Sequence, residues 1–163
     1  MYVTLGTMWS EPAVFRAVLD GLADQPVDVI VTVGTGNDPA ALEPVPGNAR
    51  VERFVPQADL LPRCAAVVHH AGAGTMFGSL AHGLPQLALP QAADNFTNAE
   101  LLRRSGAGRV LLPGEATADS VRHAVRALLD EPGVSDAAAK VADEIAAMPS
   151  PDEVAAELRR RFG

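Results

Sequence analysis

Two adjacent histidines followed by a run of small residues are the side chains of this sequence best suited to binding a ligand. His69 and His70 follow an apolar run at residues 65–68, and no residue in 71–74 is larger than alanine. Such a run predicts a strand buried on both faces of a parallel sheet, and Thr75 opens a segment with the apolar spacing of a helix. A strand, a glycine turn and a helix N-terminus bring unpaired amides and the helix dipole together. The segment therefore predicts an anion site, with phosphate as the first ligand to consider.

The two histidines are expected to have different environments. Successive side chains of a strand point to opposite faces, so one of His69 and His70 should face the ligand crevice while the other packs or hydrogen-bonds inside the fold. Metal binding is not indicated, because four histidines and the distant Cys64 show no familiar ligand spacing.

The glycines also invite comparison with the fingerprint of nicotinamide-dinucleotide sites. In residues 72–78 the third glycine comes one position too late for that pattern. The acidic residue that binds the ribose should end the next strand, whereas Asp94 lies several residues beyond it. A P-loop is excluded, because no Gly-Lys-Ser/Thr follows the glycines. The spacing therefore disfavours both kinds of nucleotide site.

A second polar cluster precedes the next expected helix. Asp94 and Asn95 lie directly before Phe96, where either side chain could serve as a helix N-cap. A carboxylate and an amide in a crevice can equally clamp adjacent hydroxyl groups, as a sugar site requires, and Gln91 fits either arrangement. Both interpretations stay open on these residues alone.

The composition limits the classes of function. A chain of 163 residues with 48% hydrophobic and 20% charged residues is typical of one globular domain. The formal net charge of −7 argues against a general nucleic-acid binder. One cysteine, no signal peptide and no apolar run of the roughly 20 residues that a membrane span needs lead us to expect a cytoplasmic protein.

Strand and helix patterns alternate along the chain. We expect strands at residues 2–5, 27–33, 51–55, 65–68, 86–89 and 109–112. The first helix is expected to have Pro12 in its first turn and to run to Leu22. Further helices are expected from 75 to a stop at Gly83 and at 96–105, 117–129, 136–148 and 154–161, with a loop at 37–48. This alternation predicts a doubly wound, Rossmann-like α/β domain with a parallel sheet of about six strands and helices on both faces. Ligands of such sheets bind beyond the carboxyl ends of the strands, where Gly6, Thr7 and the histidine pair lie.

Five motifs occur in the order found in glycosyltransferases of the GT-B fold, and the sequence resembles most the actinobacterial enzymes that glycosylate antibiotics and other natural products. The resemblance covers essentially the whole chain. Its motifs are Thr4-Leu5-Gly6-Thr7, Arg53-Phe54-Val55-Pro56-Gln57, His69-His70-Ala71-Gly72-Ala73-Gly74-Thr75, Gly83-Leu84-Pro85-Gln86 and residues 90–99.

The resemblance implies that residues 1–163 form a single domain, the C-terminal, nucleotide-sugar-binding half of a two-domain enzyme whose N-terminal acceptor domain is absent here. It assigns the donor's diphosphate to Gly6, Thr7, His70, Gly72, Ala73, Gly74 and Thr75. It assigns the nucleobase to Phe54, Val55 and Gln57, and the sugar to Gln91, Asp94 and Asn95. Asn95 stands where the family usually carries the longer glutamine.

The chemistry implied is transfer from a TDP- or UDP-sugar to a small-molecule acceptor with inversion, without a metal or other cofactor. The general base is expected in the N-terminal domain, so no catalytic residue is assigned here. The expected partners are the nucleotide-sugar and the acceptor domain, with no nucleic acid and no membrane span. A donor half that pairs with a separate acceptor chain, and a non-catalytic nucleotide-binding module, remain as alternatives.

Overall fold

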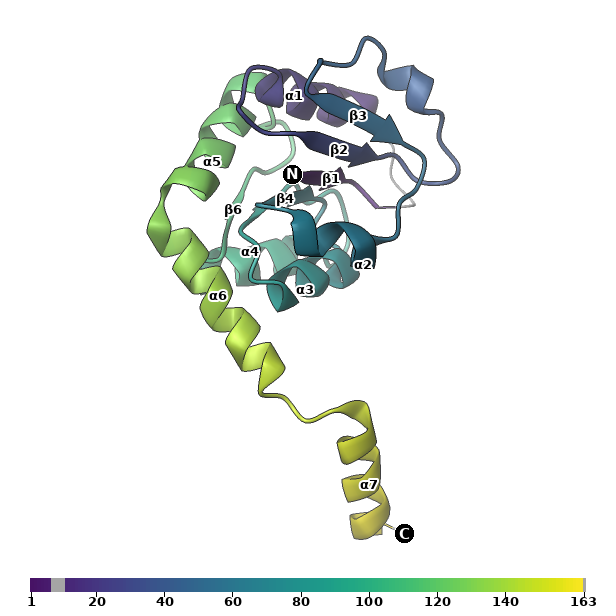
Figure 1. The fold of residues 1–163 in the computed structure, drawn as a ribbon, viewed down its shortest axis with the longest axis vertical. Coiled ribbons are helices and arrows are strands. Elements are labelled where there is room, and N and C mark those ends of the chain that lie inside the picture. Colours follow the sequence, from purple (N-terminus) through teal and green to yellow (C-terminus); the bar gives the residue numbers. More distant parts are fainter. Residues whose placement is uncertain (7–10, 163) are drawn as a thin grey trace.

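A computed structural model describes residues 1–6 and 11–162 of the chain, so the predicted diphosphate contact Thr7 lies outside the described residues. Six parallel strands form one sheet in the order β3-β2-β1-β4-β5-β6 (Figure 1). The strands are β1 (Tyr2–Thr4), β2 (Val29–Thr32), β3 (Ala49–Glu52), β4 (Val67–His69), β5 (Gln86–Ala88) and β6 (Gly108–Val110). The sheet is that of a doubly wound α/β domain, as predicted, and its order reverses between β1 and β4.

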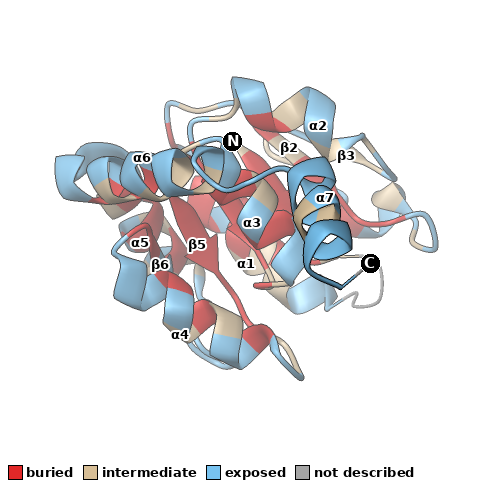
Figure 2. Cartoon of the chain, turned by 90° about the horizontal axis from the view of Figure 1, so that it is seen from below, coloured by how far each residue is buried: buried red, intermediate tan, exposed pale blue. Residues whose placement is uncertain are grey.

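Helices cover both faces of the sheet. The α-helices are α1 (Pro12–Leu22), α2 (Gln57–Leu60), α3 (Ala73–Ala81), α4 (Asn95–Ser105), α5 (Ala118–Asp130), α6 (Pro132–Ala146) and α7 (Pro151–Phe162). Two short 3₁₀ helices, η1 (Pro39–Leu42) and η2 (Leu61–Arg63), complete the description. Helices α1 and α5 pack together on one face, while α3, α4 and α6 pack on the other (Figures 1 and 2).

The larger apolar core lies between the sheet and the pair α1 and α5. Val3, Val31, Val68 and Leu87 of the four central strands are at most 1% exposed and belong to this core. Gly21 lets the two helices approach closely, because a Cβ added there would come within 2.7 Å of the Ala118 carbonyl oxygen. Small contact residues of this kind suit helices packed tightly over a sheet.

The opposite face of the sheet carries more polar side chains. Tyr2, Val67, His69 and Gln86 are at most 2% exposed there, and a second apolar cluster around Met76 joins α3 to α4 and α6. Buried polar side chains on this face have hydrogen-bond partners, which offsets the cost of removing them from water. This is the face from which the turn between β4 and α3 is supported.

Several predicted element bounds were wrong. The third strand was expected at 51–55 but lies at Ala49–Glu52, so the apolar pair Phe54 and Val55 falls in the loop after it. The helix expected from Thr75 begins at Ala73, with Gly72 as its N-cap. Helix α6 was expected from residue 136 but begins at Pro132, because proline needs no hydrogen-bond acceptor in a first helical turn. The predicted loop at 37–48 includes the 3₁₀ helix η1.

Helix α7 buries none of its twelve residues, a property that it shares only with the four-residue helix α2 among the described α-helices. It follows residues 147–150 and projects away from the sheet and its covering helices (Figure 1). Val154, Leu158 and Phe162 on it are 43%, 52% and 83% exposed. Within the described residues, no helix is both long enough and apolar enough to cross a lipid bilayer.

Candidate functional site

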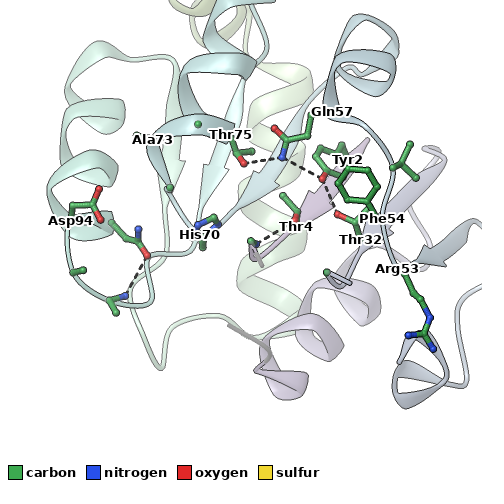
Figure 3. Close-up of a pocket in the computed structure, with 18 residues that line it drawn as sticks. Tyr2, Thr4, Thr32, Arg53, Phe54, Gln57, His70, Ala73, Thr75 and Asp94 are labelled. Carbon is green, nitrogen blue, oxygen red and sulfur yellow. Dashed lines mark hydrogen bonds between the residues drawn. The ribbon is translucent and has the colours of Figure 1, made fainter. Parts of the chain in front are cut away.

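A cavity of about 570 Å³ opens at the carboxyl ends of the strands (Figure 3). It spans the point where the strand order reverses between β1 and β4, which is where open α/β sheets bind ligands. Its volume lies in the range of about 300–1,000 Å³ that is usual for small-molecule sites. Its lining combines residues that lie in β1 and β2 or follow one of the strands β1 to β5: Tyr2, Thr4, Gly6, Thr32, Gly34, Arg53, Phe54, Val55, Gln57, His70, Gly72, Ala73, Gly74, Thr75, Ala92, Ala93, Asp94 and Asn95.

His70 is the histidine that reaches the cavity, while His69 is completely buried. The His70 ring lies between two glycines. A Cβ on Gly6 would come within 2.8 Å of its Cε1, and a Cβ on Gly72 would overlap its Nε2. Gly6 also has a φ of +83°, which side-chain-bearing residues rarely adopt. Both glycines therefore make room for the imidazole, and the predicted division of roles between the two histidines is confirmed.

The N-terminus of α3 faces the same space as His70. Gly72 is the N-cap and has no side chain to accept from the first amides, whereas the Met76 amide already donates to the Gly72 carbonyl oxygen at 3.0 Å. The backbone N–H groups of Ala73, Gly74 and Thr75 belong to the part of a helix that has no intrahelical acceptor. All three residues line the cavity, so free amides and the positive end of the helix dipole converge on it.

The electrostatic surroundings of His70 act in two directions. Burial lowers its pKa, while the nearby Asp94 carboxylate and the Thr4 backbone favour the protonated form. The Nδ1 atom of His70 is buried and has no hydrogen-bond partner of normal geometry among the described residues. The Asp94 carboxylate accepts a hydrogen bond from Asn98 Nδ2 at 3.2 Å and does not cap α4, although Asp94 occupies the N-cap position. The capping interpretation of Asp94 is therefore not supported.

A polar network forms the opposite wall of the cavity. Gln57 Nε2 donates to Thr75 Oγ1 at 3.0 Å and lies 3.5 Å from the Tyr2 hydroxyl, which is 2.8 Å from Thr32 Oγ1 (Figure 3). Because Thr75 Oγ1 accepts from Gln57, its own hydrogen is available for a ligand oxygen. Tyr2, Thr4 and Thr32 were not predicted as lining residues. Thr4 and Thr32 could have been found as polar side chains at the carboxyl ends of β1 and β2, whereas Tyr2 begins β1 and gave no such signal.

The loop after β3 supplies the exposed aromatic side of the cavity. Phe54 is 61% exposed and Val55 lines the cavity beside it. Arg53 lies next to them and forms an ion pair with Asp38 at 3.7 Å. An exposed ring at the edge of a cavity can stack on a flat ligand such as a nucleobase.

Two of the three predicted sugar contacts are constrained by other bonds. Gln91 is not among the lining residues, so the structure does not bring it to the site, and its Nε2 donates to the Leu89 carbonyl oxygen at 2.8 Å. Asn95 lines the cavity but is only 7% exposed. With its amide oriented to satisfy its neighbours, Nδ2 donates to the carbonyl oxygens of Ala92 and His70 at 3.1 and 3.2 Å. Asp94 is the exposed member of the three.

The described residues contain no group of three or more histidine, cysteine or carboxylate side chains placed to hold a metal ion. The donors that line the cavity include backbone amides, hydroxyls, the His70 imidazole and the Arg53 guanidinium. Together these groups can bind a phosphate or diphosphate.

Comparison with known proteins places this geometry in a family. Residues 16–160 match the family model described as "Erythromycin biosynthesis protein CIII-like, C-terminal domain". The chain belongs to this family, which confirms the resemblance inferred from the five motifs.

Its relatives are glycosyltransferases of antibiotic biosynthesis. The chain is 43% identical over 128 residues to elloramycin glycosyltransferase of Streptomyces olivaceus, covering 78% of this chain and 32% of the relative. It is 37% identical over 155 residues to 3-alpha-mycarosylerythronolide B desosaminyl transferase of Saccharopolyspora erythraea, covering 93% and 37%. The chain thus spans about a third of the length of these curated relatives.

Solved structures of the same class share the fold. The calicheamicin glycosyltransferase CalG4 superposes with a TM-score of 0.90 at 30% identity, covering 99% of this chain and 44% of that one. The glycosyltransferase VinC, crystallised with DTDP, superposes with a TM-score of 0.84 at 33% identity, covering 98% and 40%. The α/β architecture of the GT-B glycosyltransferases is therefore confirmed for this chain.

Proposed function

We propose that this chain is the donor-binding domain of an inverting, metal-independent glycosyltransferase that takes a TDP- or UDP-sugar and transfers the sugar to a small-molecule acceptor. The observation that carries the proposal is the convergence of His70 and the free amides of α3 on one cavity at the sheet's reversal point. A diphosphate needs these donors. The DTDP in the VinC structure supports a pyrimidine nucleotide.

The lining residues divide the cavity among the parts of the donor. We assign the diphosphate to His70 and the first turn of α3, and the nucleobase to Phe54 and the loop that follows β3. The sugar then lies toward Asp94, the exposed carboxylate at the other end of the lining. A carboxylate can accept hydrogen bonds from two adjacent hydroxyls, which is what a sugar presents.

The chemical role of the domain follows from where charge develops. As the anomeric C–O bond breaks, negative charge accumulates on the leaving diphosphate, and amides already aimed at it stabilise that charge without reorganising. The His70 imidazole adds a hydrogen bond to the same oxygens. The acceptor hydroxyl attacks from the opposite face of the sugar, which inverts the configuration. We place the acceptor pocket and the base that takes the hydroxyl proton in a separate N-terminal domain.

A thermal-shift titration with TDP, UDP, ADP and NAD at matched concentrations tests the proposal. A ligand that binds only the folded state stabilises it by RT ln(1 + [L]/Kd), about 2.7 kcal/mol at one hundred times Kd. We expect TDP or UDP to raise the melting temperature and ADP and NAD to leave it unchanged. A response to NAD or ADP alone, or to none of the four, would contradict a pyrimidine-nucleotide site in this chain.

A further inference from the structure

A chain of three buried hydrogen bonds, which we call the relay, runs behind the diphosphate cradle. The cradle is the proposed diphosphate subsite formed by His70 and residues 72–75. The Ala71 amide donates to His69 Nδ1 at 2.9 Å, and His69 Nε2 lies 2.6 Å from Gln86 Oε1. The amide nitrogen of Gln86 in turn donates to the Met76 carbonyl oxygen at 3.3 Å. His69, Gln86 and Ala71 have no exposed surface, and Met76 is 2% exposed. No atom of this relay touches the cavity.

The two ends of the relay fix every proton in it. A backbone N–H can only donate and a backbone carbonyl can only accept, so the chain of bonds has one direction, from Ala71 to Met76. His69 must therefore be neutral, with its proton on Nε2 and its lone pair on Nδ1. Burial lowers the pKa of His69 to about 4, which agrees with a neutral ring.

Both ends of the relay lie in the segment that forms the cradle. Ala71 directly precedes the N-cap Gly72, and Met76 belongs to the first turns of α3. The φ of Ala71 is +65°, an unfavourable value for a residue with a side chain, so its peptide group needs support. His69 holds the Ala71 amide from one side, and Asn98 Nδ2 donates to the Ala71 carbonyl oxygen at 3.0 Å from the other.

We propose that His69, whose tautomer Gln86 sets, is a positioning residue for the donor diphosphate: its Nδ1 holds the turn at residues 70–72 in the one conformation that aims the His70 ring and the α3 amides at the same point. The inference rests on the proposed function and extends it to residues outside the cavity. The alternative is that the pair is part of the core and affects stability alone.

Two substitutions of similar size separate these roles. In His69→Asn the side-chain oxygen can take the place of Nδ1 and accept from the Ala71 amide, but the side chain is too short for Gln86. In His69→Gln the amide can reach Gln86 but leaves the Ala71 amide without its acceptor. Both variants remove a buried imidazole, so a purely structural role predicts that both lose stability and that their ligand affinities change to a similar extent.

Positioning predicts that the two variants differ in ligand affinity. We expect His69→Asn to bind TDP or UDP within about twofold of the unsubstituted chain and His69→Gln roughly tenfold more weakly, the loss that a broken hydrogen bond produces. The matched control is Ser79→Ala, which removes a buried hydrogen bond of the same helix, from Ser79 Oγ to the Thr75 carbonyl oxygen, and leaves the turn intact. This control should lower stability and leave nucleotide affinity unchanged.

Calorimetric titration with the nucleoside diphosphate gives these affinities, and ligand-observed NMR with the nucleoside alone shows whether the base subsite is intact. The loss in His69→Gln should be confined to the diphosphate. A ¹⁵N spectrum of the unsubstituted chain should identify Nδ1 as the unprotonated nitrogen of His69, which tests the relay even if a variant fails to fold.

The positioning role would be overturned if the two variants bound the nucleoside diphosphate with equal affinity, or if His69→Gln lost as much affinity for the nucleoside alone as for the diphosphate. A proton on Nδ1 of His69 would overturn it as well. Failure of the proposed function looks different, because the unsubstituted chain itself would then bind neither TDP nor UDP.

Discussion

The imidazole of His70 is partly buried and lines the cavity. Gly6 and Gly72 make room for the ring, whose Nε2 edge lies in the space that a Cβ on Gly72 would fill. Its contribution to binding should therefore be a direct hydrogen bond to a phosphate oxygen.

Replacement of His70 by alanine removes that bond. We expect nucleoside diphosphate binding to weaken by roughly 1–3 kcal/mol, the usual cost of losing a hydrogen bond to a charged group. Titration calorimetry measures the change. The control is His123→Ala, since His123 is exposed on α5 away from the cavity, and it should bind as the unsubstituted chain does. Unchanged affinity in His70→Ala would remove this histidine from the site.

The neutral, buried His69 makes stability depend on pH. Its pKa is about 4 in the folded chain against 6.5 as an unperturbed value, so between these pH values the unfolded chain binds a proton that the folded chain does not. The contribution of neutral His69 to the free energy of unfolding is therefore fully present above about pH 6.5. It falls as the pH drops toward 4, by up to about 1.4 kcal/mol per pH unit. His70, whose pKa is shifted in the same direction, adds to this loss.

Urea unfolding at several pH values within this window checks the prediction. The variant His69→Asn removes the titrating group, and its stability should depend less on pH there. An equally steep dependence in the variant would show that other groups are responsible.

Sequence reasoning reached the identity of these residues but not their partners. The alternation of a strand was enough to predict that one histidine faces the crevice. The partner of His69 could not be predicted, because Gln86 lies 17 positions away and reaches His69 only through the register of β4 on β5. The same applies to Gln57 and Thr75, which meet across two elements.

At the scale of elements, the N-cap of α3 and its first turn each contain a glycine, and alanine at the two positions should have different effects on ligand affinity and on stability. In Gly72→Ala the new methyl group overlaps His70 Nε2, so the ring must move and nucleotide affinity should fall. Gly74 has open space around its Cβ position and lies within the helix. Gly74→Ala should therefore stabilise the fold by roughly 0.4–1 kcal/mol, because alanine restricts the unfolded chain. Chemical unfolding and nucleotide titration of both variants measure the two effects, and an unchanged affinity in Gly72→Ala would contradict the first.

Hydrophobic patterning was enough to predict the order of strands and helices, but it did not predict where some of them begin and end. Phe54 and Val55 extend the apolar pattern of the third strand, and for that reason the strand was placed too late in the chain. Their apolar character serves the cavity edge instead, where Phe54 remains mostly exposed. Local sequence cannot distinguish an apolar residue that faces a core from one that faces a ligand.

At the scale of the whole molecule, α7 is separate from the cooperative core. None of its described residues is buried, and a helix of this length is marginal in water on its own. A chain truncated after Met148 should therefore keep its free energy of unfolding within about 0.5 kcal/mol, as surface changes usually do. Urea unfolding of the two chains checks this, and circular dichroism reports the helical signal lost with α7. A larger loss of stability would show that α7 packs on the domain in solution.

We expect the cavity to bind an anion through dipoles rather than through a field of fixed positive charge. Among the described residues that line it, Arg53 is the one permanently charged cation, and it is paired with Asp38, while the chain as a whole carries −7. A nucleotide in solution is therefore repelled at long range and held only on contact. Added salt screens the repulsion more than the contact, so we expect the affinity measured by calorimetry to stay level or rise between about 50 and 300 mM salt. A steep fall would contradict this. A site built in this way accepts a small anion by its shape while the surrounding surface keeps polyanions away.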